Sequence, residues 1–328
     1  MKLQRIATPM TRLTVALSLL LGSFGALAQN YPSRPVRVIV PFPAGGNTDI
    51  TVRPLSSKLG EIFGQTFLVD NRGGANTIIG AEIAARATPD GHTLLVGAQN
   101  TLAINPHAYS KLPYDVKKDF APIALLTDYN YLLVARPGFP ANNIPDLVKY
   151  AKANPGKVSH ASVGEGSSGH LAQLLFESMA GVKIIHVPYK GNAPMVADLL
   201  GGTVDLALMG LASIQALHKA GKVKLIAVAA DMRLAEMPDL PTVQEAGYAG
   251  FTSGTFQGLL TQAAVPRAIV TRLNREVNRA LQSPEVKTAL EAQKVTLGNG
   301  TPEEFGKRIA FESERWGKVV KSVNLKFD

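Results

Sequence analysis

The sequence predicts an α/β protein of two lobes, with parallel-rich sheets flanked by helices and a double hinge crossing between the lobes. Three observations lead to this expectation. After residue 28, short apolar runs alternate with amphipathic helical runs almost to the end of the chain, a pattern typical of parallel sheets covered on both faces. Proline-containing segments interrupt the alternation at 128–140 and 232–241. The length of 328 residues is enough for two domains of ordinary size.

The first 28 residues are expected to be a targeting segment and not part of the fold. Three basic residues precede an almost wholly apolar run at 13–27, and the run ends in a small-x-small cleavage site at Ala28. These are the parts of a cleaved secretory signal peptide, and they predict a periplasmic mature protein. An uncleaved membrane anchor is the alternative, and the apolar run is short for a bilayer span.

The composition excludes several classes of function. The chain contains no cysteine, so disulfides, a lipid-anchored cysteine and thiolate metal sites are ruled out. The formal net charge is +9, but the positive residues are scattered and do not form a stripe with interleaved aromatic residues, so no nucleic acid partner is expected. A basic surface of this kind aids solubility and mildly attracts small anions.

The predicted elements follow from hydrophobic periodicity. The strand candidates are 36–40, 65–70, 93–97, 123–126, 131–135, 158–162, 183–187, 206–208, 225–229 and 258–260. The helix candidates are 49–63, 79–87, 144–154, 168–180, 193–201, 213–220, 267–281, 285–292 and 302–322. If the two proline-containing segments cross one hinge, lobe 1 comprises 29–128 plus 238–328 and lobe 2 comprises 129–237. A ligand is then expected between the lobes, at the carboxyl ends of strands.

The loop after the first predicted strand is the clearest candidate for a binding site. Two prolines and the pair Gly45-Gly46 exclude regular structure, and Asn47, Thr48 or Asp49 can cap the helix that follows. The N-terminus of that helix leaves backbone N–H groups uncovered, where the helix dipole favours an anion. Two alternatives stay open: the loop is a tight connection that uses glycine for shape alone, or Asp49 only satisfies the helix dipole.

Two further loops at predicted strand ends of lobe 1 carry hydrogen-bonding groups. The loop 71–77 combines two glycines with Asn76 and with Arg72, which can pair with a carboxylate but can equally brace the loop. The loop 97–101 contains Gln99, Asn100 and Thr101, of which one is expected to contact a ligand.

In the middle segment, the loop 161–170 contains G-x-G-x-x-G, but a dinucleotide site is not expected. The next predicted strand, 183–187, is followed by no acid that could bind a ribose hydroxyl. With Ser162, Ser167 and Ser168, the loop is better explained as a second donor-rich helix N-terminus, suited to a carboxylate. His170 is expected to be a first-turn helix residue and not a catalytic base.

Enzyme motifs are missing from the sequence. It has no G-x-S-x-G nucleophile elbow and no His-x-x-x-His spacing, so no catalytic residue, metal or cofactor is expected. A serine hydrolase that uses Ser167 or Ser168 with a distant histidine stays open. Trp316 has the spacing of a core residue. Phe256 fits an aromatic wall of the cleft and an ordinary core position equally well.

Taken together, the motifs resemble the Bug family of extracytoplasmic solute receptors, the TctC-like binding components of tripartite tricarboxylate transport systems. The resemblance runs from about residue 31 to the C-terminus, and the number of motifs in order makes it specific. The motifs lie at 31–49, 69–72 with 79–81, 89–95, 104–106, 164–171, 186–191 and 237–247.

The resemblance implies a type II periplasmic-binding-protein-like fold and a small carboxylate ligand, bound by backbone amides, small polar side chains and water. It implies delivery of the ligand by a monomeric receptor to membrane permease subunits; a ligand sensor for a signalling system is the alternative. The family motifs place binding residues at Phe42, Gly45, Gly46, Thr48, Asp49, Ala75, Asn76, Asn100, Ser162, Gly166, Ser167 and Ser168.

Two departures from the family pattern bear on the ligand, and we include Gly210 and Phe256 in the expected site because of them. Relatives often carry a polar pair after the strand that here runs through 206–211, which has no polar side chain. Relatives also often have tryptophan where this chain has Phe256. An unpaired buried charge is costly, so we expect a carboxylate that lacks an amino group and has an apolar or aromatic body.

Overall fold

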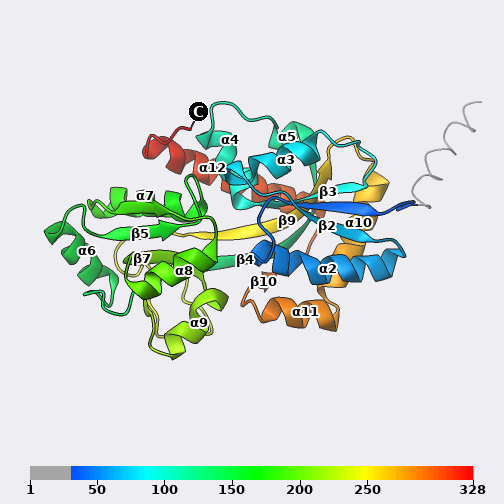
Figure 1. Ribbon diagram of the computed structural model, residues 1–328. Helices are drawn as coiled ribbons and strands as arrows, with labels where there is room; N and C mark the ends of the chain where they lie inside the picture. The colour runs from blue at the N-terminus through cyan, green and yellow to red at the C-terminus, as the bar shows by residue number, and fades with distance from the viewer. Residues whose placement is uncertain (1–30, 328) are drawn as a thin grey trace, which may run out of the picture.

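The computed structural model describes residues 31–327, which form one ten-stranded mixed sheet with helices on both faces (Figure 1). The strand order is β2-β1-β3-β9-β4-β7-β5-β6, and β8 and β10 also pair with β4. The strands are β1 (Val36–Val40), β2 (Phe67–Asn71), β3 (Thr93–Ala98), β4 (Phe120–Ala135), β5 (Ser159–Ser162), β6 (Ile185–Pro188), β7 (Leu206–Gly210), β8 (Lys224–Val228), β9 (Gly254–Gln262) and β10 (Thr296–Leu297).

The helices confirm the predicted α/β class. They are α2 (Asn47–Phe63), α3 (Ile78–Ala85), α4 (Asn105–Ala108), α5 (Val116–Asp119), α6 (Ile144–Ala153), α7 (Ser168–Ala180), α8 (Asn192–Gly201), α9 (Leu211–Lys219), α10 (Arg267–Leu281), α11 (Pro284–Glu291) and α12 (Pro302–Ser322), with short helical turns at Ala75–Thr77 and Asn100–Ile104. The signal peptide expected at 1–28 lies outside the described residues. Within 31–327, no helix is both long and apolar enough to cross a membrane.

Strands β4 and β9 connect two halves of the sheet. The first part of β4, through Asn130, pairs antiparallel with β9, and its last part, from Tyr131, pairs with β7 and β8. The returning chain crosses beside it, since Tyr131 N–H donates to the carbonyl of Ser253 at 2.9 Å. Figure 1 shows β5 and β7 with α6 to α9 on one side of these crossings and β1 to β3 with α2 and α10 on the other. The side with β5 and β7 is lobe 2, and the side with β1 to β3 is lobe 1.

The second crossing lies later in the chain than the expected boundary at 238. Val243 and Phe251 are buried in the core of lobe 2, and Thr242 bridges to Val228 of β8. The proline-containing segment 232–241 is therefore a loop of lobe 2 and not the hinge. The structure accordingly divides lobe 1 into 31–130 plus 254–327 and makes 131–253 lobe 2.

The sheet is parallel only in part. Strands β1, β2 and β3 run parallel in lobe 1, and β5, β6 and β7 run parallel in lobe 2, as expected for strand–helix alternation. Every pair that includes β4 or β9 is antiparallel. The two crossings run in opposite directions, so the strands that join the lobes cannot follow the parallel order of the outer strands.

Both faces of each half are buried, which explains why the central strands are continuous apolar runs. In β1, Val38 packs with α2 and α10, while Ile39 packs on the opposite face with α3 and α12. A separate apolar cluster around Trp316 joins α12 to Leu171 of α7. The lobes therefore make contact through side chains as well as through the crossing strands.

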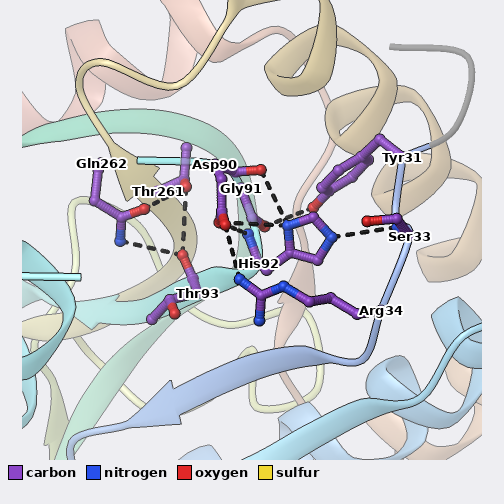
Figure 2. A network of polar contacts seen from close by, with 9 residues as sticks. All are labelled: Tyr31, Ser33, Arg34, Asp90, Gly91, His92, Thr93, Thr261 and Gln262. Carbon is purple, nitrogen blue, oxygen red and sulfur yellow. Dashed lines mark hydrogen bonds and ion pairs between the residues drawn. The ribbon is translucent and has the colours of Figure 1, made fainter. Parts of the chain in front are cut away.

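The start of the described chain is attached to the amino ends of β1 and β3 (Figure 2). The Tyr31 hydroxyl donates to the carbonyl of Gly91 at 2.6 Å, and Arg34 pairs with Asp90 at 2.7 Å. The backbone N–H of Ser33 donates to Nε2 of His92 at 3.3 Å. The motifs at 31–34 and 89–93 thus form one structural network at the end of the strands opposite to the predicted binding loops.

Helix α12 is bound to both crossing strands through a buried carboxylate. Glu312, whose side chain is 2% exposed, pairs with Arg308 at 3.3 Å and with Arg315 at 3.2 Å. Arg308 also pairs with Asp128 of β4 at 3.0 Å, and Arg315 donates to the carbonyl of Thr252 at 2.5 Å. Burial raises the pKa of Asp128, although Arg308 opposes the shift. This network connects the two strands of the hinge on the α12 side.

We expect the replacement Glu312→Gln to lower the free energy of unfolding by about 2 kcal/mol, because it leaves two guanidinium groups without their shared anion. The matched control is Glu314→Gln in the same helix, whose side chain is 72% exposed and pairs with exposed Lys318. That change is expected to have no measurable effect on the free energy of unfolding, because exposed ion pairs contribute little. Urea unfolding followed by circular dichroism measures both; equal effects of the two replacements would contradict a structural role for Glu312.

Candidate functional site

The first predicted loop leads into α2, and the carboxylate of Asp49 stabilises the conformation of this loop. Gly45 has a φ of +77° and Gly46 is the residue before the helix. Oδ2 of Asp49 accepts from the N–H of Gly45 at 2.9 Å and from Nε of Arg53 at 2.8 Å. Burial alone would raise the pKa of Asp49, but these two donors outweigh it and hold the pKa below its ordinary value. Asp49 therefore supports the loop.

The N-terminus of α2 is left with backbone donors. The N–H of Ile50 makes the first bond of the helical ladder, to the carbonyl of Gly46 at 3.0 Å. The N–H groups of Asn47, Thr48 and Asp49 consequently have no partner within the helix. The Thr48 hydroxyl is already engaged by Nε2 of Gln257 at 3.0 Å. The first loop thus presents backbone amides to a ligand, while Oδ2 of Asp49 and the hydroxyl oxygen of Thr48 already accept hydrogen bonds from the protein.

Beside this loop, residues 75–77 form a strained turn. Ala75, Asn76 and Thr77 have φ angles of 45°, 49° and 77°, values that cost energy for residues with a side chain. Three amide contacts hold the turn: Nδ2 of Asn100 donates to Oδ1 of Asn76 at 2.8 Å, Nδ2 of Asn76 to Oδ1 of Asn105 at 2.9 Å, and Nδ2 of Asn105 to the carbonyl of Asn76 at 2.8 Å. Sequence analysis selected the first two asparagines but missed Asn105, which its motif at 104–106 contained.

In lobe 2, two histidines brace the loop before α7. The rings of His170 and His186 stack with centroids 3.7 Å apart. Nδ1 of His170 accepts from the N–H of Gly166 at 3.1 Å, and Nε2 of His186 lies 2.6 Å from Oγ of Ser162. Oγ of Ser167 caps the helix by accepting from the N–H of His170 at 3.3 Å. His170 is a first-turn helix residue as expected, and its ring fixes the loop.

These contacts show which hydrogen-bonding groups of the loop before α7 already have partners within the protein. Ser162, Ser167 and the N–H of Gly166 all bond within the loop. The N–H of Leu171 bonds to the carbonyl of Ser167 at 3.0 Å, so the N–H groups of Ser168 and Gly169 have no partner within the helix. As in lobe 1, backbone amides are what the loop can offer to a ligand.

The loops of the two lobes face one another. A methyl group added at Gly166 of lobe 2 would lie 3.0 Å from Nδ2 of Asn76 in lobe 1 and 2.8 Å from the ring of Phe327. The structure therefore brings together the two groups of residues that sequence analysis had placed on opposite sides of one site.

Two tyrosines of β4, which sequence analysis did not select, lie where the lobes join. A side chain at Gly210 would come within 2.9 Å of the ring of Tyr129, and the rings of Tyr129 and Tyr131 are 5.9 Å apart in a T-shaped arrangement. Oγ of Ser168 lies 3.2 Å from the hydroxyl of Tyr131. The signal available in the sequence was an aromatic pair at alternate positions directly after the boundary predicted at 128.

Phe256, which we included in the expected site while leaving both a cleft wall and a core position open, takes the core position. Its side chain is 0% exposed and packs edge-to-face with Phe305 of α12 at 6.1 Å. Its neighbour Gln257 contacts Thr48 at the start of α2. Because successive side chains of a strand point to opposite faces, Phe256 belongs to the core beneath α12.

The remaining selected residues lie close to these contacts. Phe42 is half-buried against the core of lobe 1, and its carbonyl accepts from Nδ2 of Asn71 at 3.1 Å. Within residues 31–327, no group of three or more histidine, aspartate or glutamate side chains is arranged to hold a metal ion.

Comparison with known proteins identifies the family. A model described as the tripartite tricarboxylate transporter family receptor, TctC, matches residues 51–325. The chain belongs to this family. Among its relatives is the protein BugT of Bordetella pertussis, which is 34% identical over 97% of this chain and 99% of the relative. The resemblance to the Bug and TctC proteins is thereby confirmed.

Solved structures agree with this membership. The chain is similar to R. palustris Rpa4515 with adipate, with a TM-score of 0.83, 34% identity and coverage of 90% of this chain and 99% of that one. It is also similar to MatC from Rhodopseudomonas palustris with bound malate, with a TM-score of 0.81, 34% identity and coverage of 88% and 100%. The periplasmic binding protein BugD matches with a TM-score of 0.80, 33% identity and coverage of 90% and 99%. These TctC relatives confirm the predicted periplasmic-binding-protein fold.

The histidine braces predict a loss of stability in acid. Burial, followed by neighbouring His186, lowers the pKa of His170 to about 4, whereas an unfolded histidine titrates near 6.5. Between these pH values the unfolded chain binds more protons, so stability falls as pH falls from about 6.5 towards about 4. We expect the replacement His170→Asn to reduce the difference in melting temperature between pH 7 and pH 5.

The control for this measurement is His218→Asn, since His218 is exposed on α9. Differential scanning calorimetry should show the unchanged pH dependence for this control and a flatter one for the His170 variant. An equally steep loss of stability in both variants would contradict the assignment.

Proposed function

We propose that this TctC-family protein is a periplasmic receptor that captures a small organic carboxylate between its lobes and delivers it to a tripartite tricarboxylate-type membrane permease. The observation that carries the proposal is the pair of amide-rich helix N-termini, α2 in lobe 1 and α7 in lobe 2, set on opposite sides of the contact between Asn76 and Gly166. Helix N-termini favour anions because of their free N–H groups and the helix dipole.

Buried polar atoms without partners support a ligand at this place. Among the described residues, Oδ1 of Asp49, Nε2 of Gln99 and Oε1 of Gln257 are buried and make no hydrogen bond. Such atoms are costly to leave unsatisfied. They lie near the carboxyl ends of β1 and β3 and the amino-terminal part of β9, which runs antiparallel to β3. There Nε2 of Gln99 can donate to a carboxylate, and water that accompanies the ligand can donate to the two oxygens.

The relatives support a carboxylate as the anion. One was solved with adipate and another with malate, and both are similar over nearly the whole of their own length. Transfer of the ligand to permease subunits, a monomeric state and a periplasmic location belong to the same proposal, supported by the family and by the export signal in the sequence. A sensor that reports occupancy to a membrane signalling protein would use the same site.

The serine contacts do not favour a hydrolase. Oγ of Ser167 is used as a helix cap. Oγ of Ser162 lies 2.6 Å from Nε2 of His186, but it also bonds the backbone of Gly164 in a tight turn. Among the described residues, no carboxylate is hydrogen-bonded to His186 to orient its ring, as a catalytic triad requires.

Binding of a carboxylate should be measurable by isothermal titration calorimetry and thermal shift. We expect at least one of adipate, malate and benzoate to bind and to stabilise the protein, by about 2.7 kcal/mol at a hundredfold excess over Kd. The neutral amides adipamide and benzamide are the matched controls and should bind far more weakly, because they lack the charge that the helix N-termini favour. Binding of the amides as tightly as the acids, or of no acid at millimolar concentration, would contradict the proposal.

A further inference from the structure

The crossing strand β4 places an aromatic surface between the two helix N-termini. Tyr129 covers Gly210 at the start of α9 in lobe 2, where an added methyl group would lie 2.9 Å from its ring. Burial raises the pKa of Tyr129, and the nearby side chain of Asn47, the first residue of α2, opposes part of that shift. One side chain of the hinge thus touches elements of both lobes.

The neighbouring tyrosine extends this surface towards α7. The ring of Tyr131 meets that of Tyr129 edge-to-face, and its hydroxyl lies 3.2 Å from Oγ of Ser168. Both side chains are only partly buried in the structure. The two rings therefore form a floor that connects the N-termini of α2 and α7.

The two guanidinium groups of the lobe 1 loops are already paired. Arg53 is bound to Asp49 at 2.8 Å and to Oδ1 of Asn71 at 3.2 Å, and Arg72 is bound to Asp70 at 2.9 Å. The strand end at Leu206–Gly210 contributes no polar side chain. A second ligand carboxylate would thus compete with an existing ion pair for these guanidinium groups, and β7 offers no carboxylate to a ligand ammonium.

Exposed apolar side chains flank the same loops. Ile50 in the first turn of α2 is 48% exposed, and Val163, directly after β5 in lobe 2, is 40% exposed. Contact with an apolar ligand would remove these side chains and the tyrosine floor from water, which is favourable in proportion to the area covered.

Resting on the proposed function, we infer that Tyr129 is a specificity-determining residue whose ring selects carboxylates with a flat, apolar body and no ammonium group. One carboxylate is bound by the amides of the helix N-termini, and the remainder of the ligand lies against the tyrosine ring. Contact between aromatic rings adds to the free energy gained from the buried area, so the tyrosine ring can discriminate between ligands of equal charge.

The test compares benzoate, adipate and aspartate by calorimetry on the full mature protein. The wild type is expected to bind benzoate at least about tenfold more tightly than aspartate, a difference of about 1.4 kcal/mol. The replacement Tyr129→Leu should weaken benzoate about tenfold and adipate by less than about threefold, whereas Tyr129→Phe, which keeps the ring, should retain most of the affinity for benzoate. A control for general loss of packing is Tyr248→Leu, in a tyrosine that packs against Phe176 of lobe 2.

The outcomes separate this inference from the proposed function. If the wild type binds adipate but not benzoate, the role of Tyr129 is refuted and carboxylate binding stands. The same holds if Tyr129→Leu weakens the binding of both acids equally while its melting temperature matches that of Tyr248→Leu. Tight binding of aspartate would also refute it. If the wild type binds no carboxylate, the proposed function itself fails.

Discussion

The structure depends on a single constraint, the pairing of β4 with β9 through the centre of one continuous sheet. Because β4 continues from its β9 partner to β7 and β8 at residues 130–131, the two lobes share backbone hydrogen bonds and not only a linker. That arrangement allows helix N-termini from both lobes to approach the same point. It also places the side chains of β4 alternately towards that point and towards α12, with Tyr129 on one face and Asp128 on the other.

Polar side chains stabilise the loops, and this determines which hydrogen-bonding groups remain free to bind a ligand. One carboxylate oxygen of Asp49, the amide of Asn76 and the hydroxyl of Ser162 are each already bonded to a neighbouring group of the protein. These contacts hold backbone conformations that are unfavourable on their own, such as the three successive positive φ angles at 75–77. The exposed donors are then backbone amides, which bear no net charge and suit a single anion without requiring a buried cation.

Much of the scaffold could be predicted from the sequence, because periodicity and glycine or proline punctuation depend on short stretches of chain. The starts of α2 and α7 were found in this way to within two residues, although the residue before α2 is Gly46 and none of Asn47, Thr48 and Asp49 caps the helix. The second crossing was misplaced, because the proline-containing segment 232–241 marks a loop, and only long-range packing of Val243 and Phe251 shows that the chain is still in lobe 2. The sequence could not decide between the cleft and the core for Phe256 for a similar reason: which face of β9 lies against α12 depends on strand register.

The residues that a family resemblance identifies and the residues that select a ligand need not be the same. The motif at 89–93 binds the start of the described chain far from the loops, and Asn105 holds the turn at Asn76; both maintain geometry that any member of the family requires. On the inference above, ligand choice depends instead on Tyr129 of the crossing strand, whose neighbour Tyr131 also packs on the core of lobe 2 and contacts Ser168. Since Tyr129 projects from the hinge strand and not from a binding loop, replacing it is expected to alter the surface that meets the ligand more than the loops that bind the carboxylate. A receptor fold of this kind can therefore acquire a new ligand by substitutions in β4 while its anion-binding helices stay unchanged.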